Sequence, residues 1–337
     1  MQAPARTRRT PQRRRLTLIA TLAAAAVSLA ACSSGGTGTA EGGEDDAASG
    51  GTTAVTVGVI PIVDVAPIYL GVQEGIFEKH GLDVTLESAQ GGAAIVPAVV
   101  SGQYQFGFSN TTSLLLATSN GLELQAVAEG VSSTGEDGAD FGAVVAPADS
   151  GIASAKDLEG KTVAVNTLNN INTTTVNKAV EADGGDPSTI TYTELAFPDI
   201  VAAVQKGDVD AGQVVEPFLT QAAGQGLEQV VSNYAVTDPD LTVAMYFTSD
   251  AFAQEDPETV QAFTEAMTES LAYAQEHPDD VRKVLTTYTE IDQATLDAMT
   301  LPRWPAEIDT DSVQLLADLA VADGLMTEAP DLSTLLP

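Results

Sequence analysis

The sequence has little of the chemistry that most catalytic and metal sites use. Its 337 residues include one cysteine, Cys32, and two histidines, His80 and His277. A lone cysteine forms no intramolecular disulfide or thiolate cluster, and the histidines do not stand in a metal-ligand spacing. No nucleophile elbow occurs either. We therefore predict a protein that is not an enzyme, with no catalytic residues, no metal and no cofactor.

Positive charge is also scarce, because 14 Lys and Arg face 47 Asp and Glu, for a formal net charge of −33. Nucleic-acid binding draws on clusters of Lys and Arg, so a nucleic-acid partner is excluded. Aromatic residues make up only 5%, but the apolar fraction of 44% is ample for a folded core. The chain is longer than one core usually supports, which favours two domains.

The first 31 residues carry six of the arginines and no acid, and they end in the apolar run 16–31. A basic start and a short apolar stretch indicate an export signal, by the general secretory or the twin-arginine route. Leu29-Ala30-Ala31-Cys32 resembles the bacterial lipobox, whose cysteine is lipidated after cleavage; the alternative is an ordinary small hydrophobic cysteine. We expect an exported protein at the outer face of the cell membrane, lipid-anchored through Cys32.

Beyond the signal, 8 basic residues face 47 acidic ones, which leaves a formal charge of −39. After Cys32, residues 33–53 are Gly, Ser, Thr, Ala and four acids, a composition that predicts a flexible tether at 32–53. From Ala54, strand-like and helix-like segments alternate, which predicts an α/β body with parallel pairing. The predicted strands are Val55–Ile60, Asp83–Glu87 and Tyr104–Phe108; the predicted helices are Pro67–Lys79, Gly92–Ser101 and one capped by Ser109-Asn110-Thr111 that runs to Ser119.

An internal repeat relates two parts of this body at a constant offset of 105 residues. Ile95–Gly102 aligns with Ile200–Gly207, and Gln103–Gly107 aligns with Asp208–Gly212. Two similar βαβαβ units in series predict two similar lobes with a ligand cleft between them. We expect lobe 1 at residues 54–145 plus 245–337 and lobe 2 at residues 146–244.

Two further strands are predicted at Phe141–Pro147 and Thr242–Ser249, at the edges of the second unit and as the two crossings between lobes. The C-terminal third is predicted to be helical. Its helices through Asp323 are expected to pack on the first lobe, and its apolar stripe is interpreted as structural core. The stripe consists of Val260, Phe263, Met267, Leu271 and Ala274.

Several short segments, in order, carry a resemblance to a known family. The sequence is similar to the bacterial ABC-importer solute-binding lipoproteins of the nitrate/sulfonate/taurine and thiamine-precursor group. The resemblance implies a type II periplasmic-binding fold, capture of a small molecule by hinge closure, and delivery to a membrane permease and its ATPase. The segments are Ala66–Gly71, Glu74–Phe77, His80–Val84, Ser101–Gln103, Ser150–Ile152, Lys156–Lys161, Gly207–Ala211 and Glu216–Phe218.

Ligand sites in α/β sheets gather where the carboxyl ends of strands meet helix N-termini. We take the ligand-binding residues from those loops. Turn and capping chemistry would explain the Asn and Thr cluster at residues 166–175 equally well, and a solvated carboxylate would explain Asp64 and Glu216 equally well. The candidates are Asp64, Gln90, Gly91, Gly92, Ser109, Asn110, Thr111, Asn166, Asn169, Asn170, Phe197, Asp199 and Glu216.

None of the eight Lys and Arg after residue 31 lies in these loops, so a sulfonate or nitrate would have to use helix N-termini, hydroxyls or Arg303. Asp64, Asp199 and Glu216 instead favour a neutral or cationic ligand, such as a thiamine-type pyrimidine or a related amine, with Trp304 among the aromatic residues available for stacking. The alternatives are a sulfonate, taurine or nitrate ligand, a secreted hydrolase that uses carboxylates alone, and a surface sensor without a transport role. We expect a monomer that touches the membrane only through its lipid anchor.

Overall fold

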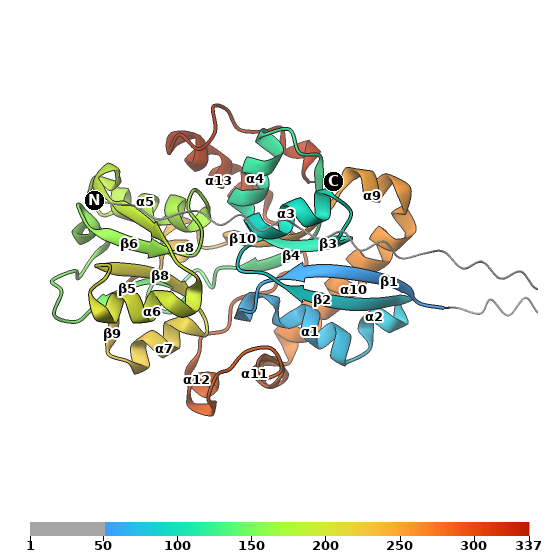
Figure 1. Cartoon of the computed structure of the whole chain (residues 1–337), viewed down its shortest axis with the longest axis horizontal. Coiled ribbons are helices and arrows are strands. Elements are labelled where there is room, and N and C mark those ends of the chain that lie inside the picture. Colours follow the sequence, from blue (N-terminus) through green and yellow to red (C-terminus); the bar gives the residue numbers. More distant parts are fainter. Residues whose placement is uncertain (1–50, 337) are drawn as a thin grey trace, which may run out of the picture. The chain divides into compact units, whose positions relative to one another are not determined.

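The computed structural model describes residues 51–336, which contain two five-stranded sheets (Figure 1). The predicted export signal, Cys32 and nearly all of the predicted tether lie outside the described residues. Across residues 51–336, no helix combines the length and apolarity needed to cross a bilayer.

The first sheet has the strand order β2-β1-β3-β10-β4. β1 pairs in parallel with β2 and β3, whereas β10 runs antiparallel to both β3 and β4. The strands are β1 Thr53–Val59, β2 Leu82–Ser88, β3 Phe106–Asn110, β4 Leu124–Ser132 and β10 Thr242–Ser249.

The second sheet repeats this arrangement in the order β7-β6-β8-β5-β9, with β6 parallel to β7 and β8 and with β5 antiparallel to β8 and β9. We call the part of the molecule built on the first sheet lobe 1 and the part built on the second sheet lobe 2. The strands are β5 Gly142–Pro147, β6 Thr162–Val165, β7 Thr191–Glu194, β8 Ala211–Val215 and β9 Leu227–Val231.

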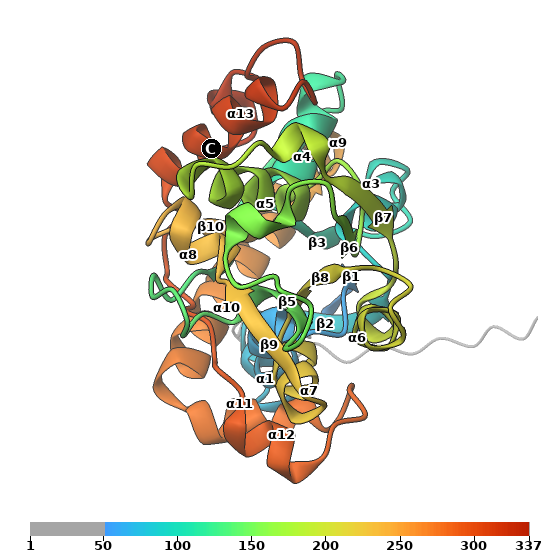
Figure 2. The same cartoon turned by 90° about the vertical axis from the view of Figure 1, so that its left-hand side faces the viewer.

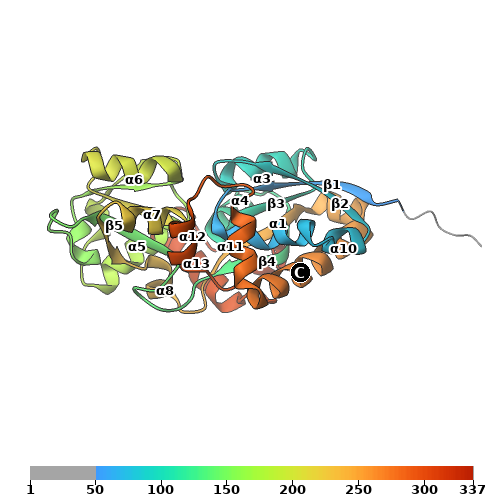
Figure 3. The same ribbon diagram turned by 90° about the horizontal axis from the view of Figure 1, so that it is seen from below.

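Helices cover both faces of the first sheet: α1, α2 and α10 pack on one face, and α3 and α4 lie on the other (Figures 1 and 3). The predicted helix 67–79 is in fact two helices, because Gly75 adopts a left-handed φ of 69° between them. In chain order these elements are η1 Val63–Val65, α1 Ala66–Gln73, α2 Ile76–Lys79, α3 Gly92–Val100 and α4 Thr111–Ser119.

The helices of lobe 2 include α5, which follows β6, and α6, which packs on β8. In chain order they are η2 Ala155–Leu158, α5 Ile171–Ala182, η3 Pro187–Thr189, α6 Phe197–Lys206, α7 Phe218–Gly224 and α8 Asn233–Thr237. The C-terminal elements are α9 Asp250–Glu255, α10 Pro257–Glu276, α11 Pro278–Leu285, α12 Gln293–Ala298, α13 Thr310–Ala322 and η4 Leu332–Thr334.

The predicted repeat is visible in the packing of the two sheets. Ile95 of α3 lies over Gly107 of β3, and Ile200 of α6 lies over Gly212 of β8, again 105 residues apart. A Cβ atom at either glycine would overlap the isoleucine side chain. The shared glycines therefore let equivalent helices approach equivalent strands.

The predicted positions of two strands were wrong. Both Phe141–Pro147 and Thr242–Ser249 were expected at the edges of the second unit as the two crossings between lobes. Instead, β5 lies between β8 and β9 inside the second sheet, and β10 lies between β3 and β4 inside the first sheet. All eight residues of β10 are buried, as expected for an interior strand. The predicted lobe limits at 145/146 and 244/245 therefore cut through β5 and β10.

The chain passes between the sheets along Ser133–Phe141 and Asp238–Leu241, and these crossings are held together. The main-chain nitrogen of Ser133 donates to the carbonyl of Leu241 (3.0 Å). Arg303 donates from Nε to the Ser133 carbonyl (2.6 Å), and from Nη2 to the Pro239 carbonyl (2.8 Å) and Asp240 Oδ1 (2.9 Å). Arg303 thus braces the crossings.

The C-terminal helices contact both lobes. The predicted stripe of α10 is confirmed as core, because Phe263, Met267, Leu271 and Ala274 are buried. However, α12 packs on α7 and α13 packs on both α4 and α5 (Figure 2). Asn177 of α5 donates from its side chain to Asp323, directly after α13 (3.0 Å). The expectation that the helices through Asp323 pack on the first lobe was therefore wrong for α12, and α13 packs on both lobes.

Candidate functional site

A small cavity lies between the lobes where β1, β3, β6 and β8 reach their carboxyl ends. Its volume is about 30 Å³, which leaves room for one or two water molecules, so the lobes are nearly closed on each other. Lobe 1 supplies Ile60, Ile62, Asp64, Phe108, Asn110, Val243 and Ala244; lobe 2 supplies Asn166, Asn170, Ile171, Asn172, Phe197, Val215 and Tyr234.

Asp64 is the only acidic residue that lines this cavity. It lies in η1, directly after β1, and is 3% exposed. No described residue donates a hydrogen bond to its Oδ1. Burial raises the pKa of Asp64 from 3.8 to about 7; its own backbone N–H opposes the shift, and the negative charge of Asp140 adds to it. A carboxyl group with one oxygen that lacks a hydrogen-bond partner therefore lines the cavity.

Three asparagines at the start of α5 provide amide groups on the opposite wall. Asn170 caps the helix by accepting from the main-chain nitrogen of Asn172 (3.1 Å). The side-chain amides of Asn172 (2.7 Å) and Asn170 (3.2 Å) both donate to Asn166 Oδ1. The two interpretations of this cluster are compatible, because Asn170 caps a helix and also lines the cavity.

Tyr234 of α8 holds the Asn172 side chain in place, because its hydroxyl donates to Asn172 Oδ1. The phenol is fully buried, and this burial raises its pKa well above the ordinary value. The negative charge of Asp64 is the second cause of the rise. The hydroxyl therefore keeps its proton and stays a hydrogen-bond donor. Its ring lies against Gly142, where any Cβ would overlap it. Asn172 belongs to the Asn and Thr cluster 166–175 for which ligand contact was considered, although it was not among the candidates; nothing in the local sequence singled out Tyr234, which depends on contacts across the fold.

Of the predicted binding residues, five line the cavity: Asp64, Asn110, Asn166, Asn170 and Phe197. Gly91 lies beside the cavity, where a Cβ would be 2.9 Å from Thr167 Oγ1 of lobe 2, and Gly92 lies against Ser109. The Thr111 hydroxyl donates to the Thr242 carbonyl (2.7 Å). The predicted residues that do not line the cavity are Gln90, Gly91, Gly92, Ser109, Thr111, Asn169, Asp199 and Glu216.

Glu216 is buried, but its carboxylate faces α7 and the C-terminal segment instead of the cavity. Oε1 accepts from Thr220 Oγ1 (2.8 Å) and from the main-chain nitrogen of Thr300 (3.1 Å), and Oε2 accepts from the main-chain nitrogen of Thr220 (3.0 Å). Burial raises the pKa of Glu216, while these hydrogen bonds and the charge of Arg282 oppose the rise. Gln90, Asn169 and Asp199 are exposed to solvent.

No Lys, Arg or His is among the residues that line the cavity. Arg303 braces the crossings, and the Trp304 indole is buried with its Nε1 donating to the main-chain carbonyl of Asp64 (3.1 Å). Among residues 51–336, no cluster of three His, Cys, Asp or Glu is arranged to hold a metal ion.

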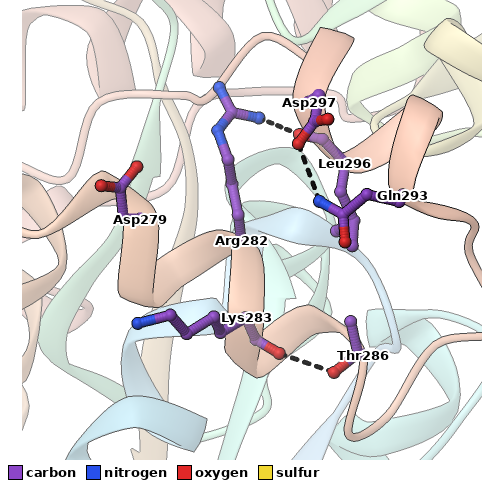
Figure 4. Close-up of a pocket in the computed structure, with 7 residues that line it drawn as sticks. All are labelled: Asp279, Arg282, Lys283, Thr286, Gln293, Leu296 and Asp297. Atoms are coloured by element: carbon purple, nitrogen blue, oxygen red, sulfur yellow. Dashed lines mark hydrogen bonds between the residues drawn. The ribbon is translucent and has the colours of Figure 1, made fainter.

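A larger pocket, of about 480 Å³, lies at the surface between α11 and α12 (Figure 4). Arg282 in its wall donates to the carbonyl of Leu296 and to the carbonyl of Met299 (3.1 Å). Gln293 donates to Asp297 (2.8 Å) in the same wall. The Arg282 guanidinium therefore satisfies the carbonyls at the end of α12.

The arrangement of two alike sheets around a cavity is shared with known proteins. A family model described as NMT1/THI5 like matches residues 62–281, well over half of the chain. The chain belongs to the NMT1/THI5-like family. The resemblance predicted from the sequence is confirmed at the level of the family.

Two curated proteins are similar to this NMT1/THI5-like chain. One is the formylaminopyrimidine-binding protein of Halalkalibacterium halodurans, 25% identical over 225 residues, which are 65% of each chain. The other is a putative aliphatic sulfonates-binding protein of Bacillus subtilis, 21% identical over 227 residues, which are 66% of this chain and 65% of that one. The chain thus matches just under two thirds of the length of either relative.

A solved structure shares the fold over most of both chains. The alkanesulfonate-binding protein SsuA from Xanthomonas axonopodis pv. citri, bound to MOPS, superposes with a TM-score of 0.71 at 17% identity, covering 85% of this chain and 99% of that one. The fold is that of the periplasmic binding proteins, as the sequence predicted.

Proposed function

We propose that the protein is the extracytoplasmic solute-binding component of an ABC importer. It captures a small organic ligand between its lobes by hinge closure and delivers it to a permease and its ATPase. The observation that carries this function is the cavity at the carboxyl ends of four strands, lined from both lobes. A motion between the lobes would enlarge such a site enough to admit a ligand, because residues of both lobes line it.

The ligand we propose is a small nitrogen-containing ring, such as a thiamine-type pyrimidine or a related amine. The lining supplies amides from Asn110, Asn166 and Asn172, apolar walls that include Phe108 and Phe197, and one carboxyl group. Rings with N–H donors match this set, because amides and a carboxylate accept such donors while aromatic walls cover the ring faces. The relative whose name records formylaminopyrimidine binding supports the same class.

The alternative ligand is a sulfonate, taurine or nitrate, in line with the sulfonate-binding name of the second relative. Such an anion would have to be held by amide donors and helix N-termini next to a buried carboxyl group, since the cavity has no cationic side chain. The composition of the lining therefore favours the nitrogen-containing ring.

Isothermal titration calorimetry tests the ligand class with the purified body, residues 51–337 and the full mature chain in parallel. The panel contains 4-amino-5-hydroxymethyl-2-methylpyrimidine, its formylaminopyrimidine counterpart, taurine, an alkanesulfonate and nitrate. We expect micromolar or tighter binding of a pyrimidine and no binding of the anions. Tight taurine binding without pyrimidine binding would overturn the proposed ligand.

We also propose that the protein is not an enzyme and that it is a monomer held at the outer face of the cell membrane by a lipid on Cys32. Turnover of a panel compound would contradict the first part. For the second part, mass spectrometry of the membrane fraction would detect diacylglyceryl-modified Cys32, and Cys32→Ser would release the protein into the medium. An unmodified Cys32 in the mature protein would contradict the anchor.

A further inference from the structure

The cleft holds one carboxyl group, that of Asp64, with an oxygen that no other described side chain satisfies. Asp64 Oδ1 is buried and receives no hydrogen bond from any described residue. A buried carboxylate in this position is costly unless a partner donates to it. Since Asp64 lines the cavity between the lobes, the space in front of it is where a ligand would supply that partner.

The groups around Asp64 supply no positive charge. Asp140 of the first crossing adds a negative charge, and three phenols lie near Asp64: Tyr234 of α8, Tyr246 of β10 and Tyr288 after α11. A fourth phenol, Tyr69 of α1, stacks on Tyr288. Burial raises the pKa of each of these phenols, so all four stay neutral. The Tyr234 hydroxyl already donates to Asn172, and the Tyr288 hydroxyl already donates to the Ile62 carbonyl (3.0 Å).

The main chain holds Asp64 in place while its side chain stays without a partner. Trp304 Nε1 donates to the Asp64 carbonyl, and the main-chain nitrogen of neighbouring Val63 donates to the Glu216 carbonyl of lobe 2 (3.2 Å). Contacts from the C-terminal segment and from lobe 2 thus fix the backbone of η1. A carboxyl group fixed in this way is preorganised to receive a donor, because little conformational freedom is lost on binding.

We propose that Asp64 determines ligand specificity: as a carboxylate it binds a protonated nitrogen of the ligand, and binding removes the proton that Asp64 carries in the free protein. This inference rests on the proposed function. If the ligand arrives neutral, the carboxyl proton passes to the ring nitrogen and none reaches solvent. If the ligand arrives as a cation, the proton is released to solvent. Both routes end in the same ion pair, with the negative charge on Asp64 and the positive charge on the ligand.

The raised pKa of Asp64 supports this exchange, because below neutral pH most of the free protein holds a neutral carboxyl group. At pH 6 the cleft therefore carries little negative charge before the ligand enters. A ligand whose ring nitrogens are too weakly basic to take the proton, as in the hydroxyl analogue that lacks the electron-donating amine, leaves the Asp64 proton in place and gains no ion pair. Selectivity between an aminopyrimidine and its hydroxyl analogue follows from this difference.

Calorimetry of the wild type and of Asp64→Asn tests the inference, with 4-amino-5-hydroxymethyl-2-methylpyrimidine and the analogue that carries a hydroxyl in place of its amine. Removing one partner of a buried charge pair is expected to weaken binding of the aminopyrimidine by about 30-fold or more. Binding of the hydroxyl analogue is expected to change by less than threefold. The matched control is Asp149→Asn, an exposed aspartate in the turn after β5, which should bind like the wild type.

A second readout does not depend on affinity. Infrared difference spectra at pH 6 should show the band of a protonated carboxylic acid that is lost when the aminopyrimidine binds to the wild type, and Asp64→Asn should lack this change. Circular dichroism and a melting curve verify that the variant is folded.

The outcomes separate the two proposals. If the wild type binds none of the pyrimidines, the proposed ligand class fails, and the role of Asp64 fails with it. If the wild type binds the aminopyrimidine and Asp64→Asn binds it within threefold of the same affinity, the role of Asp64 is overturned while the proposed function stands. A ligand-bound spectrum that keeps the carboxylic-acid band would overturn the proton transfer.

Discussion

The indole nitrogen of Trp304 donates a hydrogen bond of 3.1 Å to the main-chain carbonyl of Asp64. These residues are 240 positions apart, and the bond connects the segment that follows α12 with the loop that follows β1. Arg303, the residue directly before Trp304, braces the crossings between the lobes. The cleft and the hinge are therefore joined through two adjacent side chains.

Trp304 is the only tryptophan of the chain, so its fluorescence reports on the cleft. We expect ligand binding to shift or quench the emission, because the indole contacts the loop that carries Asp64. Trp304→Phe should lose the signal and one hydrogen bond, which is worth about 1 kcal/mol of stability. A ligand that binds in the calorimeter without any change in emission would contradict the coupling between Trp304 and the cleft.

Stability should depend on pH through Asp64. Its pKa is about 7 in the folded protein and 3.8 in the ordinary state, so the unfolded chain ionises first as the pH rises. The contribution of Asp64 to stability is therefore greatest below about pH 4, falls between about pH 4 and 7, and is constant above about pH 7. At about 1.4 kcal/mol per pKa unit, the loss approaches about 4 kcal/mol.

Urea unfolding of the wild type and of Asp64→Asn at pH 4 to 8 measures this loss. The two free energies of unfolding should approach each other at pH 4, and the variant should be more stable at pH 8. Three other carboxyl groups with raised pKa contribute the same slope to both proteins: Glu129, Glu216 and Asp323. Asp140 also has a raised pKa, and because its charge acts on Asp64, the difference between the two proteins reports Asp64 together with this interaction. If the difference between the free energies of unfolding of the two proteins did not change with pH, the prediction would be contradicted.

Closure of the lobes should be sensitive to Gly91. A Cβ there would lie 2.9 Å from Thr167 Oγ1 of the opposite lobe, while the extended backbone (φ −171°) accepts any residue. We expect Gly91→Leu to leave stability within about 0.5 kcal/mol and to weaken ligand binding at least tenfold, because the leucine meets lobe 2 only on closure. Small-angle scattering with ligand should show an open body.

The control for Gly91→Leu is Gly224→Leu, at the end of α7, where a Cβ meets no atom within 4 Å. This variant should bind ligand and close like the wild type. Normal closure of Gly91→Leu would show that the approach of Gly91 to Thr167 is not needed in the ligand-bound state.

Asn172 and Tyr234 should be energetically coupled. Asn172→Ala leaves the buried Tyr234 hydroxyl without its acceptor, and Tyr234→Phe leaves Asn172 Oδ1 without its donor. Each single change should cost about 1–3 kcal/mol of stability, and the double variant should cost clearly less than the two together. Additive losses in chemical denaturation would show that the hydroxyl and the amide act independently.

Much of the fold could be predicted because its signals are local. The repeat at an offset of 105 marks equivalent helices and strands, and Asn110 and Asn170 were recognisable as residues that precede helices. The partners of β5 and β10 could not be predicted, because their hydrogen bonds run to strands far away in the sequence. Their continuous apolar character signalled burial without indicating the sheet.

In the site, too, the residues marked by a local sequence signal could be predicted, and those placed by distant contacts could not. Asp64 was predictable, since the end of β1 leads directly into the cavity, but the side-chain direction of Glu216 was not. Its carboxylate is turned away by hydrogen bonds to Thr220 and Thr300, and the latter lies 84 residues further on. Tyr234 reaches the cleft from a short helix with no local pattern of its own.

The placement of β10 has a consequence for the order in which the protein folds. The first sheet needs β10 to join β3 to β4, so it cannot be completed before residue 249 has been synthesised. The second sheet uses only residues 142–231, a continuous stretch. We therefore expect the middle of the chain to fold before its beginning, and a chain truncated at residue 241 to leave β3 and β4 as unpaired edges open to aggregation.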